Sequence, residues 1–590
     1  MIVKMKKITL LVSSKRISSA VGNLRGLGLM HIKHMMEPVA EDISIYENKL
    51  QLLDRAMYLL GDSRINSRDL NHHQISFYVK EVIIVNRKKH ELENELKELQ
   101  DKHIWFQKWG DVSSHSLAEL REAGVFVKLY LCNKKELKQL PKDKLIYTLG
   151  KSRGVFYLAA FFNNQEESLS LEEIDIPEEN LSFLQRKCIT AQEELKEINK
   201  ELDRANTYRE QFDEYRNEIL KIIEFYKVRS GASYSQEICC IQGFCPAQAV
   251  SKISKVAEEE GWATINQEPD DNDQVPTLIR NPKWVEIIKP VFNFMGTIPG
   301  YKEYDISFWF LVFFSIFFAM LVGDAGYGLL FLAITFFTQR KFKKAQQGIF
   351  WLFYLLSGAT VVWGALTGTW FGMEEIARLP FLNSLVIHRI NSFVESNQIF
   401  MIHLCFFIGA IHLTIAHGIR AFRFINSRLA LSQIGWISIV WSVFFVAGKL
   451  VLSKEVPTIT PTLFIFGVGL VVLFSYPKKN IFKGALLSLA DLPLKVINSF
   501  SDVVSYLRLF AVGYATVAVA MAFNSMALEL GINSIFSGIV AALILILGHI
   551  LNILLALMAV IVHGVRLNML EFSSHLDMEW SGIKYEPFRE

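Results

Sequence analysis

The sequence carries little net charge of either sign. Its 62 Lys and Arg residues nearly balance 59 Asp and Glu residues, which leaves a formal charge of +3 over 590 residues. A protein that binds nucleic acid usually shows a basic excess or a dense basic patch. The balance therefore argues against nucleic acid as a partner.

Cysteine is scarce, and its spacing fits neither a metal site nor a disulfide framework. None of the six cysteines belongs to a CxxC pair, which is the spacing that zinc sites and redox motifs use. We expect reduced, mostly buried thiols, no metal and no other cofactor. The six are Cys132, Cys188, Cys239, Cys240, Cys245 and Cys405.

Two further signals are missing. The N-terminal stretch MIVKMKKITLLVSSKR has a short apolar patch but no small-residue cleavage site, so we predict no signal peptide. The GKS at Gly150–Ser152 lacks the earlier glycine of a phosphate loop, because Leu145 stands at that position. We therefore expect no nucleotide site and no catalytic site of the chain's own.

Long apolar runs are absent from the first half of the chain and dominate the second. Hydrophobic residues make up 51% of the sequence, but up to about Tyr304 they are mixed with charged residues. Beyond that point, blocks of roughly 20 apolar residues recur, which is the length of a membrane-spanning helix. We predict a soluble domain over 1–300 and a transmembrane domain over 301–590.

The soluble half is predicted to be a dumbbell, in which two α+β lobes are joined by a long antiparallel helical hairpin. Alternating segments such as KKITLLV and GVFVKLYLC indicate strands. Apolar residues at 3–4 spacing from Leu181 to Leu202 indicate a coiled-coil seam. The predicted parts are a proximal lobe (1–40 and 230–280), a helical stalk (41–110 and 178–229) and a distal lobe (111–177).

An all-α membrane domain of eight transmembrane helices, with both termini inside, is predicted for the second half. Lys and Arg cluster at Arg340–Lys344, Arg420–Arg428 and Lys478–Lys483, and such loops stay in the cytoplasm. A soluble half and an Arg340–Lys344 loop on the same side require two crossings between them. The first block is then a hairpin that turns at Gly323, Asp324 and Gly326, where glycine permits the reversal. For Asp324, capping of this turn is favoured over a place in an ion path.

The last two apolar blocks, 484–529 and 534–571, are too long for simple spans and are predicted to be long and tilted. A cation such as Arg508 costs roughly 3 kcal/mol in hydrocarbon, which marks it as a functional candidate. At ~100° per residue, the polar side chains of each block fall in one sector. We expect ion translocation along these stripes. The first block contributes Asp491, Lys495, Asp502, Ser505, Arg508 and Thr516, of which Asp491, Asp502, Ser505 and Arg508 are the site candidates, and the second block contributes His549, Asn552, His563 and Arg566. For Ser505, Thr516 and Asn552, hydrogen bonds to neighbouring helices are an equally favoured alternative.

Four stretches resemble the membrane stator subunit of V-type and V/A-type rotary ATPases, called subunit a or subunit I. They are SYLRLFAVGYA around Arg508, HGVRLNMLEF around Arg566, MLVGDAGYG at Met320–Gly328, and NPKWVEIIKPVFNFMGTIPGYKEYD before the first span. The resemblance implies a prokaryotic member of this family in a bacterial or archaeal cell membrane, with its N-terminal domain in the cytoplasm. It also implies that the chain moves protons or sodium ions and hydrolyses no ATP itself.

The same resemblance implies the partners. The two long helices would face a rotating proteolipid c/K-ring, whose carboxylates meet Arg508 and Arg566. The peripheral-stalk E/G subunits would bind the soluble lobes, and the central-stalk C/d subunit is a further expected partner, beside the lipid bilayer.

The chain departs from the family pattern at its acids. Relatives usually carry an acid at the position of Ala556 and often another where Leu494 and Lys495 stand. Asp491, Asp502, His549 and His563 are the candidates to replace them, although Asp491 and Lys495 are also spaced for an ion pair along one helix.

Two other classes of protein remain as alternatives. A secondary ion transporter with a cytoplasmic regulatory strut would show repeats between its membrane halves, and none is visible. A purely structural anchor would not need buried arginines.

Three histidines in one apolar segment, His403, His412 and His417, do not have the spacing of a metal site.

Overall fold

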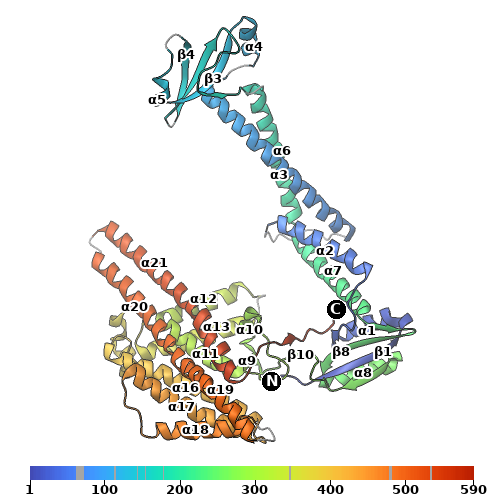
Figure 1. Ribbon diagram of the computed structural model, residues 1–590, viewed down its shortest axis with the longest axis vertical. Coiled ribbons are helices and arrows are strands. Elements are labelled where there is room, and N and C mark those ends of the chain that lie inside the picture. Colours follow the sequence, from blue (N-terminus) through green and yellow to red (C-terminus); the bar gives the residue numbers. More distant parts are fainter. Residues whose placement is uncertain are drawn as a thin grey trace. The chain divides into compact units, whose positions relative to one another are not determined.

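Helices dominate the computed structural model of the chain (Figure 1). The structure describes residues 1–61, 72–111, 114–141, 144–152, 154–176, 179–343, 347–476, 481–531 and 534–589. Parts of two predicted basic clusters, Lys344 and Lys478–Asn480, lie outside these residues, as do the short parts of the predicted stalk and distal lobe that fall in the gaps. The chain forms two units, one of Met1–Thr9, Leu29–His31 and Gly243–Phe588, the other of Leu10–Gly28, Ile32–Gln242 and Arg589–Glu590.

A five-stranded sheet joins the start of the chain to residues more than two hundred positions later. Its order is β2-β8-β1-β9, with β7 paired to β8. Glycines in the left-handed region end the helices that follow β1 and β8, namely Gly28 (φ 59°) after α1 and Gly261 (φ 74°) after α8. The elements are β1 (Met5–Ser13), α1 (Ile17–Leu27), β2 (His31–Lys33), β7 (Ser233–Ser235), β8 (Ile238–Pro246), α8 (Val250–Glu260) and β9 (Ala263–Gln267).

Four helices form the stalk region of the second unit. Helix α2 packs on α7, and α3 packs on α6. The buried residues Leu184, Ala191 and Ile198 of α6 recur at intervals of seven, as in a coiled coil, and the last two enclose Leu92 of α3. The bounds are α2 (Glu41–Leu59), α3 (His72–Trp109), α6 (Leu181–Asn206) and α7 (Arg209–Ser230).

A four-stranded sheet of order β4-β5-β3-β6 lies between α3 and α6 in the sequence. Its strands are antiparallel, with Leu129 of β3 opposite Ala159 of β5. The two faces bury different sets of side chains, one set around Tyr130 and the other around Trp109 of α3. The elements are α4 (Ser114–Glu122), β3 (Phe126–Asn133), α5 (Lys134–Leu137), β4 (Leu145–Ser152), β5 (Val155–Phe162) and β6 (Glu172–Ile174).

The membrane half contains five helical segments that are long and apolar enough to span a bilayer, counted over the described residues. They are Gln347–Thr367, Glu395–Arg423, Leu429–Leu452, Phe482–Leu530 and Ile535–His575. A bent pair, α11 (Ser307–Val322) and α12 (Ala325–Lys341), passes the same test together, and α18 (Thr460–Phe474) is apolar but shorter. Eight crossings and a cytoplasmic soluble half therefore remain predictions.

Helix α11 forms the centre of the membrane half. Twelve of its 16 residues are buried, because a helix that is apolar all round fits inside a bundle. It packs on α13 (Gln347–Thr367), α20 (Leu507–Leu530) and α21 (Ile535–Ala559). The remaining long helices are α16 (Gln398–Arg423), α17 (Leu429–Leu452) and α19 (Ile481–Ser505).

Both long C-terminal segments are interrupted, whereas the sequence predicts regular helices. The first is divided at Tyr506 into α19 and α20. The second continues beyond α21 as two π-helical stretches, Val560–Gly564 and Leu567–Phe572, followed by the short α22 (Ser573–His575). A π-helix makes i→i+5 hydrogen bonds, so the ~100° spacing assumed for this segment is wrong after Ala559.

Candidate functional site

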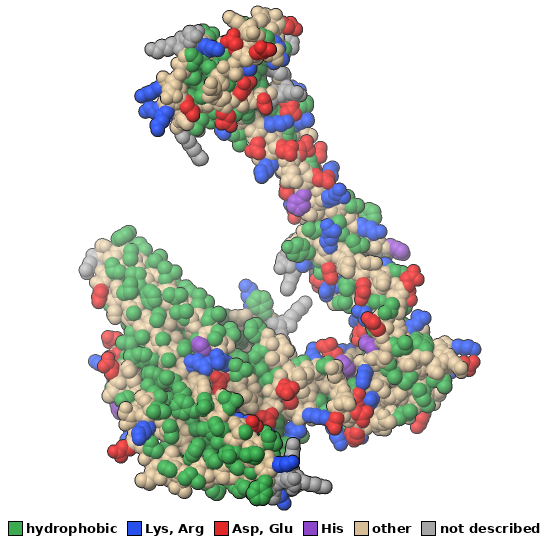
Figure 2. Space-filling model, in the orientation of Figure 1, with side chains coloured by type: hydrophobic (Ala, Val, Ile, Leu, Met, Phe, Trp, Pro, Cys, Tyr) green, Lys and Arg blue, Asp and Glu red, His purple; other side chains and the backbone are tan. Residues whose placement is uncertain are grey.

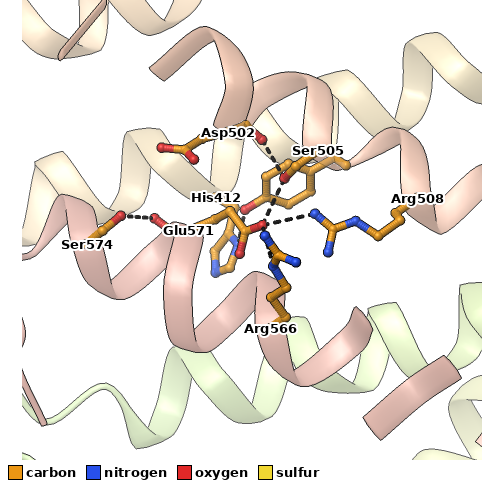
Figure 3. A network of polar contacts seen from close by, with 8 residues as sticks. His412, Asp502, Ser505, Arg508, Arg566, Glu571 and Ser574 are labelled. Carbon is orange, nitrogen blue, oxygen red and sulfur yellow. Dashed lines mark hydrogen bonds and ion pairs between the residues drawn. The ribbon is translucent and has the colours of Figure 1, made fainter. Parts of the chain in front are cut away.

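Arg508 lies in the first turn of α20, directly after the break at Tyr506. Its Nη2 donates a hydrogen bond to Oε1 of Glu571 at 3.2 Å, and the side chains are 22% and 5% exposed. Figure 3 shows the guanidinium pointing toward this carboxylate from the neighbouring helix. The predicted cation thus has a buried counter-charge on the other long segment.

Arg566 approaches the same carboxylate oxygen. Its Nε lies 3.7 Å from Oε1 of Glu571, and its side chain is 54% exposed. Residues five apart point in different directions on an α-helix, but the i→i+5 geometry of a π-helix brings them close to one face. The π-helical stretch Leu567–Phe572 therefore allows Arg566 and Glu571 to share a site.

The cluster of Arg508, Arg566 and Glu571 carries an excess of positive charge. Two guanidinium groups face one carboxylate. Among the described residues, Nη1 of Arg508 and Oε2 of Glu571 are buried without a hydrogen-bond partner. The hydroxyl of Ser505 lies 3.1 Å from Oε1 of Glu571 and 2.8 Å from the Asp502 carbonyl oxygen, and its single proton serves one or the other.

The Asp502 carboxylate points away from the two arginines (Figure 3). Its Oδ2 lies 3.0 Å from Nε2 of His575. Nδ1 of His575 lies 3.0 Å from Nε2 of His417, whose Nδ1 lies 2.9 Å from Oε1 of Gln433. A continuous chain of polar contacts thus runs from α19 through α22 and α16 to α17.

Tyr506, at the break between α19 and α20, is fully buried. Its hydroxyl is hydrogen-bonded to Nδ1 of His412 at 2.8 Å. The His412 ring is stacked between Phe313 at 3.9 Å and Phe572 at 4.2 Å. This packing fixes the position at which α20 begins and so the position of Arg508.

Asn552 and His549 lie in a second polar cluster, on α21. The Asn552 side-chain amide donates to the Thr516 carbonyl oxygen at 2.8 Å and to the Tyr327 hydroxyl at 3.0 Å. The same hydroxyl lies 2.7 Å from Nδ1 of His549. This cluster links α12, α20 and α21, and among the described residues no hydrogen bond or ion pair joins it to the arginine cluster.

Asp324 caps α12. Its Oδ1 accepts hydrogen bonds from the backbone N–H groups of Gly326, Tyr327 and Phe371, and its Oδ2 accepts one from Gly372 at 2.9 Å. Gly323 has φ 70°, which favours glycine, and the helix direction bends there by 118° between α11 and α12. The carboxylate therefore holds the turn to the segment that follows α13.

Two predicted site residues form no hydrogen bond with these clusters, within the part of the chain that the structure describes. The Asp491 carboxylate accepts a hydrogen bond from the Tyr476 hydroxyl at 2.8 Å, at an exposed position. His563 is half-buried, and its Nδ1 has no hydrogen-bond partner among the described residues. No group of three His, Cys, Asp or Glu side chains that suits a metal ion occurs in the described part of the chain.

Sequence reasoning missed five members of these networks, which are Tyr327, Tyr506, Glu571, His575 and Gln433, and it considered His412 and His417 only as metal ligands. Glu571 lies inside the HGVRLNMLEF stretch itself. It is an acid five residues after Arg566. On a regular α-helix this separation would point the two side chains in different directions, so no contact was expected. The presence of an ionisable residue in an apolar block was the signal that could have identified it.

The fold and the site define a polytopic membrane protein that holds an arginine pair at its last two long helices. A family profile described as the V-type ATPase 116kDa subunit family matches residues 159–356. V-type ATP synthase subunit I of Borreliella burgdorferi is 32% identical over 619 residues and covers 100% of both chains. Subunit I 1 of Treponema pallidum is 29% identical, with the same coverage. The chain belongs to this V-type ATPase subunit family, which confirms the resemblance.

Another relative and one solved structure are also similar to parts of this chain. The A-type ATP synthase subunit I of Methanocaldococcus jannaschii is 27% identical over 422 residues, which cover 64% of this chain and 59% of the relative. A crystal structure of the cytoplasmic N-terminal domain of subunit I, homolog of subunit a, of V-ATPase matches with a TM-score of 0.25 and 12% identity. It covers 44% of this chain and 99% of that chain.

Proposed function

We propose that this chain is the membrane stator subunit of a V/A-type rotary ATPase or ATP synthase in a bacterial or archaeal cell membrane. Its last two long segments face a proteolipid ring and provide two half-channels for ions. The soluble half is cytoplasmic and anchors the peripheral-stalk E/G subunits, and the central-stalk C/d subunit is a further partner. The chain hydrolyses no ATP itself. Family membership and the recurring apolar helices support this role.

The observation that carries the proposal is the charge excess beside Glu571. One carboxylate is shared by two guanidinium groups, so the cluster attracts a second carboxylate. A neutral ring carboxylate travels through lipid, and a cation within about 4–6 Å lowers a carboxylate pKa by roughly 1–3 units. The ring carboxylate then releases its ion beside Arg508.

Glu571 is the counter-ion of Arg508 before the ring carboxylate arrives and after it leaves. While no ring carboxylate is present, Glu571 holds Arg508 at 3.2 Å. When the ring carboxylate arrives, Arg508 exchanges one anion for another, and Arg566 remains within reach of Glu571. The buried cation is therefore never without a counter-ion, which lowers the cost of keeping it in a low-dielectric region.

The exposed surface of α21 is apolar, which suits contact with a proteolipid ring or with lipid. Exposed large hydrophobic side chains on α21 include Ile539, Leu543, Ile546, Ile550 and Leu554. Their 3–4 spacing places them on one helix face. In Figure 2, hydrophobic side chains cover these helices, and basic and histidine side chains gather in one small area among them.

Replacement of Arg508 tests the proposal. In complexes reconstituted into vesicles, Arg508→Ala should abolish ATP-driven ion pumping while the proteolipid ring still co-purifies. Arg508→Lys should restore little, because lysine lacks the planar fork and loses its proton more readily when buried. Normal pumping by Arg508→Ala, or a chain that transports ions without a ring, would favour a secondary transporter instead.

A further inference from the structure

We propose that Asp502, His575, His417 and Gln433 form a proton relay that serves the inner half-channel, and that the translocated ion is the proton. This inference rests on the proposed function, and it adds the identity of the ion and of one path. Three consecutive contacts of 2.9–3.0 Å link the four side chains. Each contact is short enough for a hydrogen bond and thus for a proton transfer.

The arrangement of the four side chains determines how many protons they share. A neutral imidazole has one N–H and one acceptor nitrogen, and an ionised carboxylate only accepts. With Oε1 of Gln433 accepting from His417 Nδ1–H, Nε2 of His417 must accept from His575 Nδ1–H. Nε2 of His575 then faces Oδ2 of Asp502 as an acceptor at 3.0 Å, so one additional proton must lie between these two atoms.

If the Gln433 amide is turned so that its nitrogen faces His417, the additional proton is no longer needed. If the amide nitrogen donates to Nδ1 of His417, then Nε2–H of His417 donates to His575, and Nε2–H of His575 donates to ionised Asp502. All three contacts are then satisfied with one proton fewer. The two arrangements differ by one proton and by the tautomers of both histidines, which are the end states of a proton relay.

The transfer balances atom by atom. A proton that binds Nδ1 of His417 displaces the proton of Nε2 to Nδ1 of His575. That ring releases its Nε2 proton to Oδ2 of Asp502. With hydronium as the proton donor, one O–H bond of the donor and two N–H bonds break, two N–H bonds and one O–H bond form, and the four side chains together gain one positive charge. After Asp502 has passed its proton on, the relay resets when both imidazole rings rotate back to present Nε2–H toward Asp502 and the Gln433 amide turns with them.

The two ends of the relay lie in different surroundings, one on the helix that precedes Arg508 and the other between α16 and α17. Asp502 precedes Ser505, whose hydroxyl contacts Glu571 at 3.1 Å. His417 lies one turn before Arg420, which forms an ion pair with Asp577 near the surface. Arg420 belongs to the basic stretch predicted to be cytoplasmic. His417 and Gln433 are buried, whereas Asp502 is 25% exposed.

The relay favours the proton over sodium. Hard cations take several oxygen ligands, whereas this chain presents ring nitrogens between its two terminal oxygen-bearing groups. At 2.9–3.0 Å the side chains are in direct contact, so an ion cannot lie between them. A proton needs no such space because it passes along the existing hydrogen bonds.

Chemical rescue tests the relay in the intact complex in vesicles. His575→Ala should lower ATP-driven proton pumping about tenfold or more, since a positioned proton-transfer group contributes at least this much. Added imidazole should restore pumping, whereas thiazole, a ring of similar size and much lower basicity, should not. His403→Gln is the matched control on α16 and should pump normally, because its ring belongs to neither the relay nor the arginine cluster.

Each outcome decides the question. Rescue by imidazole alone, with pumping that does not depend on sodium, supports the relay. Unchanged pumping by His575→Ala, equal rescue by both rings, no rescue, or sodium-dependent pumping would overturn it. Arg508→Ala is measured in parallel. If that variant is inactive while the relay fails its test, the stator assignment stands without the relay, and if that variant pumps, the stator assignment itself is wrong.

Discussion

Arg508 and Glu571 lie 63 positions apart in the chain, yet one guanidinium nitrogen and one carboxylate oxygen of the pair lie 3.2 Å apart. The contact joins the start of α20 to the π-helical end of the last segment. It makes Glu571 the resting counter-ion of the arginine that the ring carboxylate is proposed to meet.

Glu571→Gln should therefore destabilise the membrane half. The substitution leaves two cations without a counter-charge, at a cost of roughly 1–3 kcal/mol, since the exposed part of Arg566 is screened by solvent. Thermal unfolding in detergent measures the effect. Glu571→Asp keeps the charge and should lose less stability; an equal loss in both variants would mean that side-chain shape matters there and charge does not.

Asp324 is expected to matter for stability more than for ion flow. Four backbone N–H groups donate to its carboxylate, and Asp324→Ala leaves them without an acceptor. We expect a loss of roughly 2–4 kcal/mol, because buried donors that lose a charged acceptor are costly. Asp324→Asn retains one acceptor oxygen and should lose less. If Asp324→Ala melts like the unmodified chain but stops pumping, the residue belongs to the ion path instead.

Two glycines of α13 offer a matched pair. A Cβ on Gly364 would overlap the backbone of Ala325, whereas a Cβ on Gly358 meets nothing within 4 Å. Gly364→Ala should therefore disturb the packing of α13 against the Asp324 turn and lower the unfolding temperature. Gly358→Ala should be neutral or stabilise by up to about 1 kcal/mol, because alanine favours a helix. Equal effects of both changes would contradict the close approach of α13 to Ala325.

The packing of α3 against α6 in the stalk can be tested at one buried residue. Ile198 is 5% exposed between Leu92 and Ala191, whereas Ile189 on the same helix is 56% exposed. Ile198→Ala should cost about 2–4 kcal/mol, and Ile189→Ala should change stability little. Similar unfolding temperatures for the two variants would show that α3 and α6 do not pack as described.

The periodic parts of the sequence were the predictable ones. The spacing of Leu184, Ala191 and Ile198 follows directly from helix geometry, and all three are buried on α6. The family resemblance, carried by the stretches around Arg508 and Arg566, is confirmed by relatives that match the whole chain. The number of crossings, the domain boundaries and the roles of individual site residues stay predictions.

The partners within the site could not be predicted because they depend on local departures from regular structure. The interruption at Tyr506 and the π-helical stretches change which side chains share a face. A constant angle per residue placed His549, Asn552, His563 and Arg566 on one stripe. In the structure, Asn552 and His549 contact Tyr327, whereas Arg566 shares Glu571 with Arg508. Tertiary contacts of this kind are not encoded in spacing along one helix.

Cross-linking tests most directly the claim that Arg508 faces the ring. A complex that combines Arg508→Cys with a proteolipid bearing cysteine in place of its membrane carboxylate should form a disulfide between the two subunits on mild oxidation. A cysteine at Trp351, which is exposed on α13, should not cross-link in the same way. Cross-linking from position 508 supports the account, whereas its absence in complexes that retain the ring, or cross-linking from position 351 alone, would contradict it.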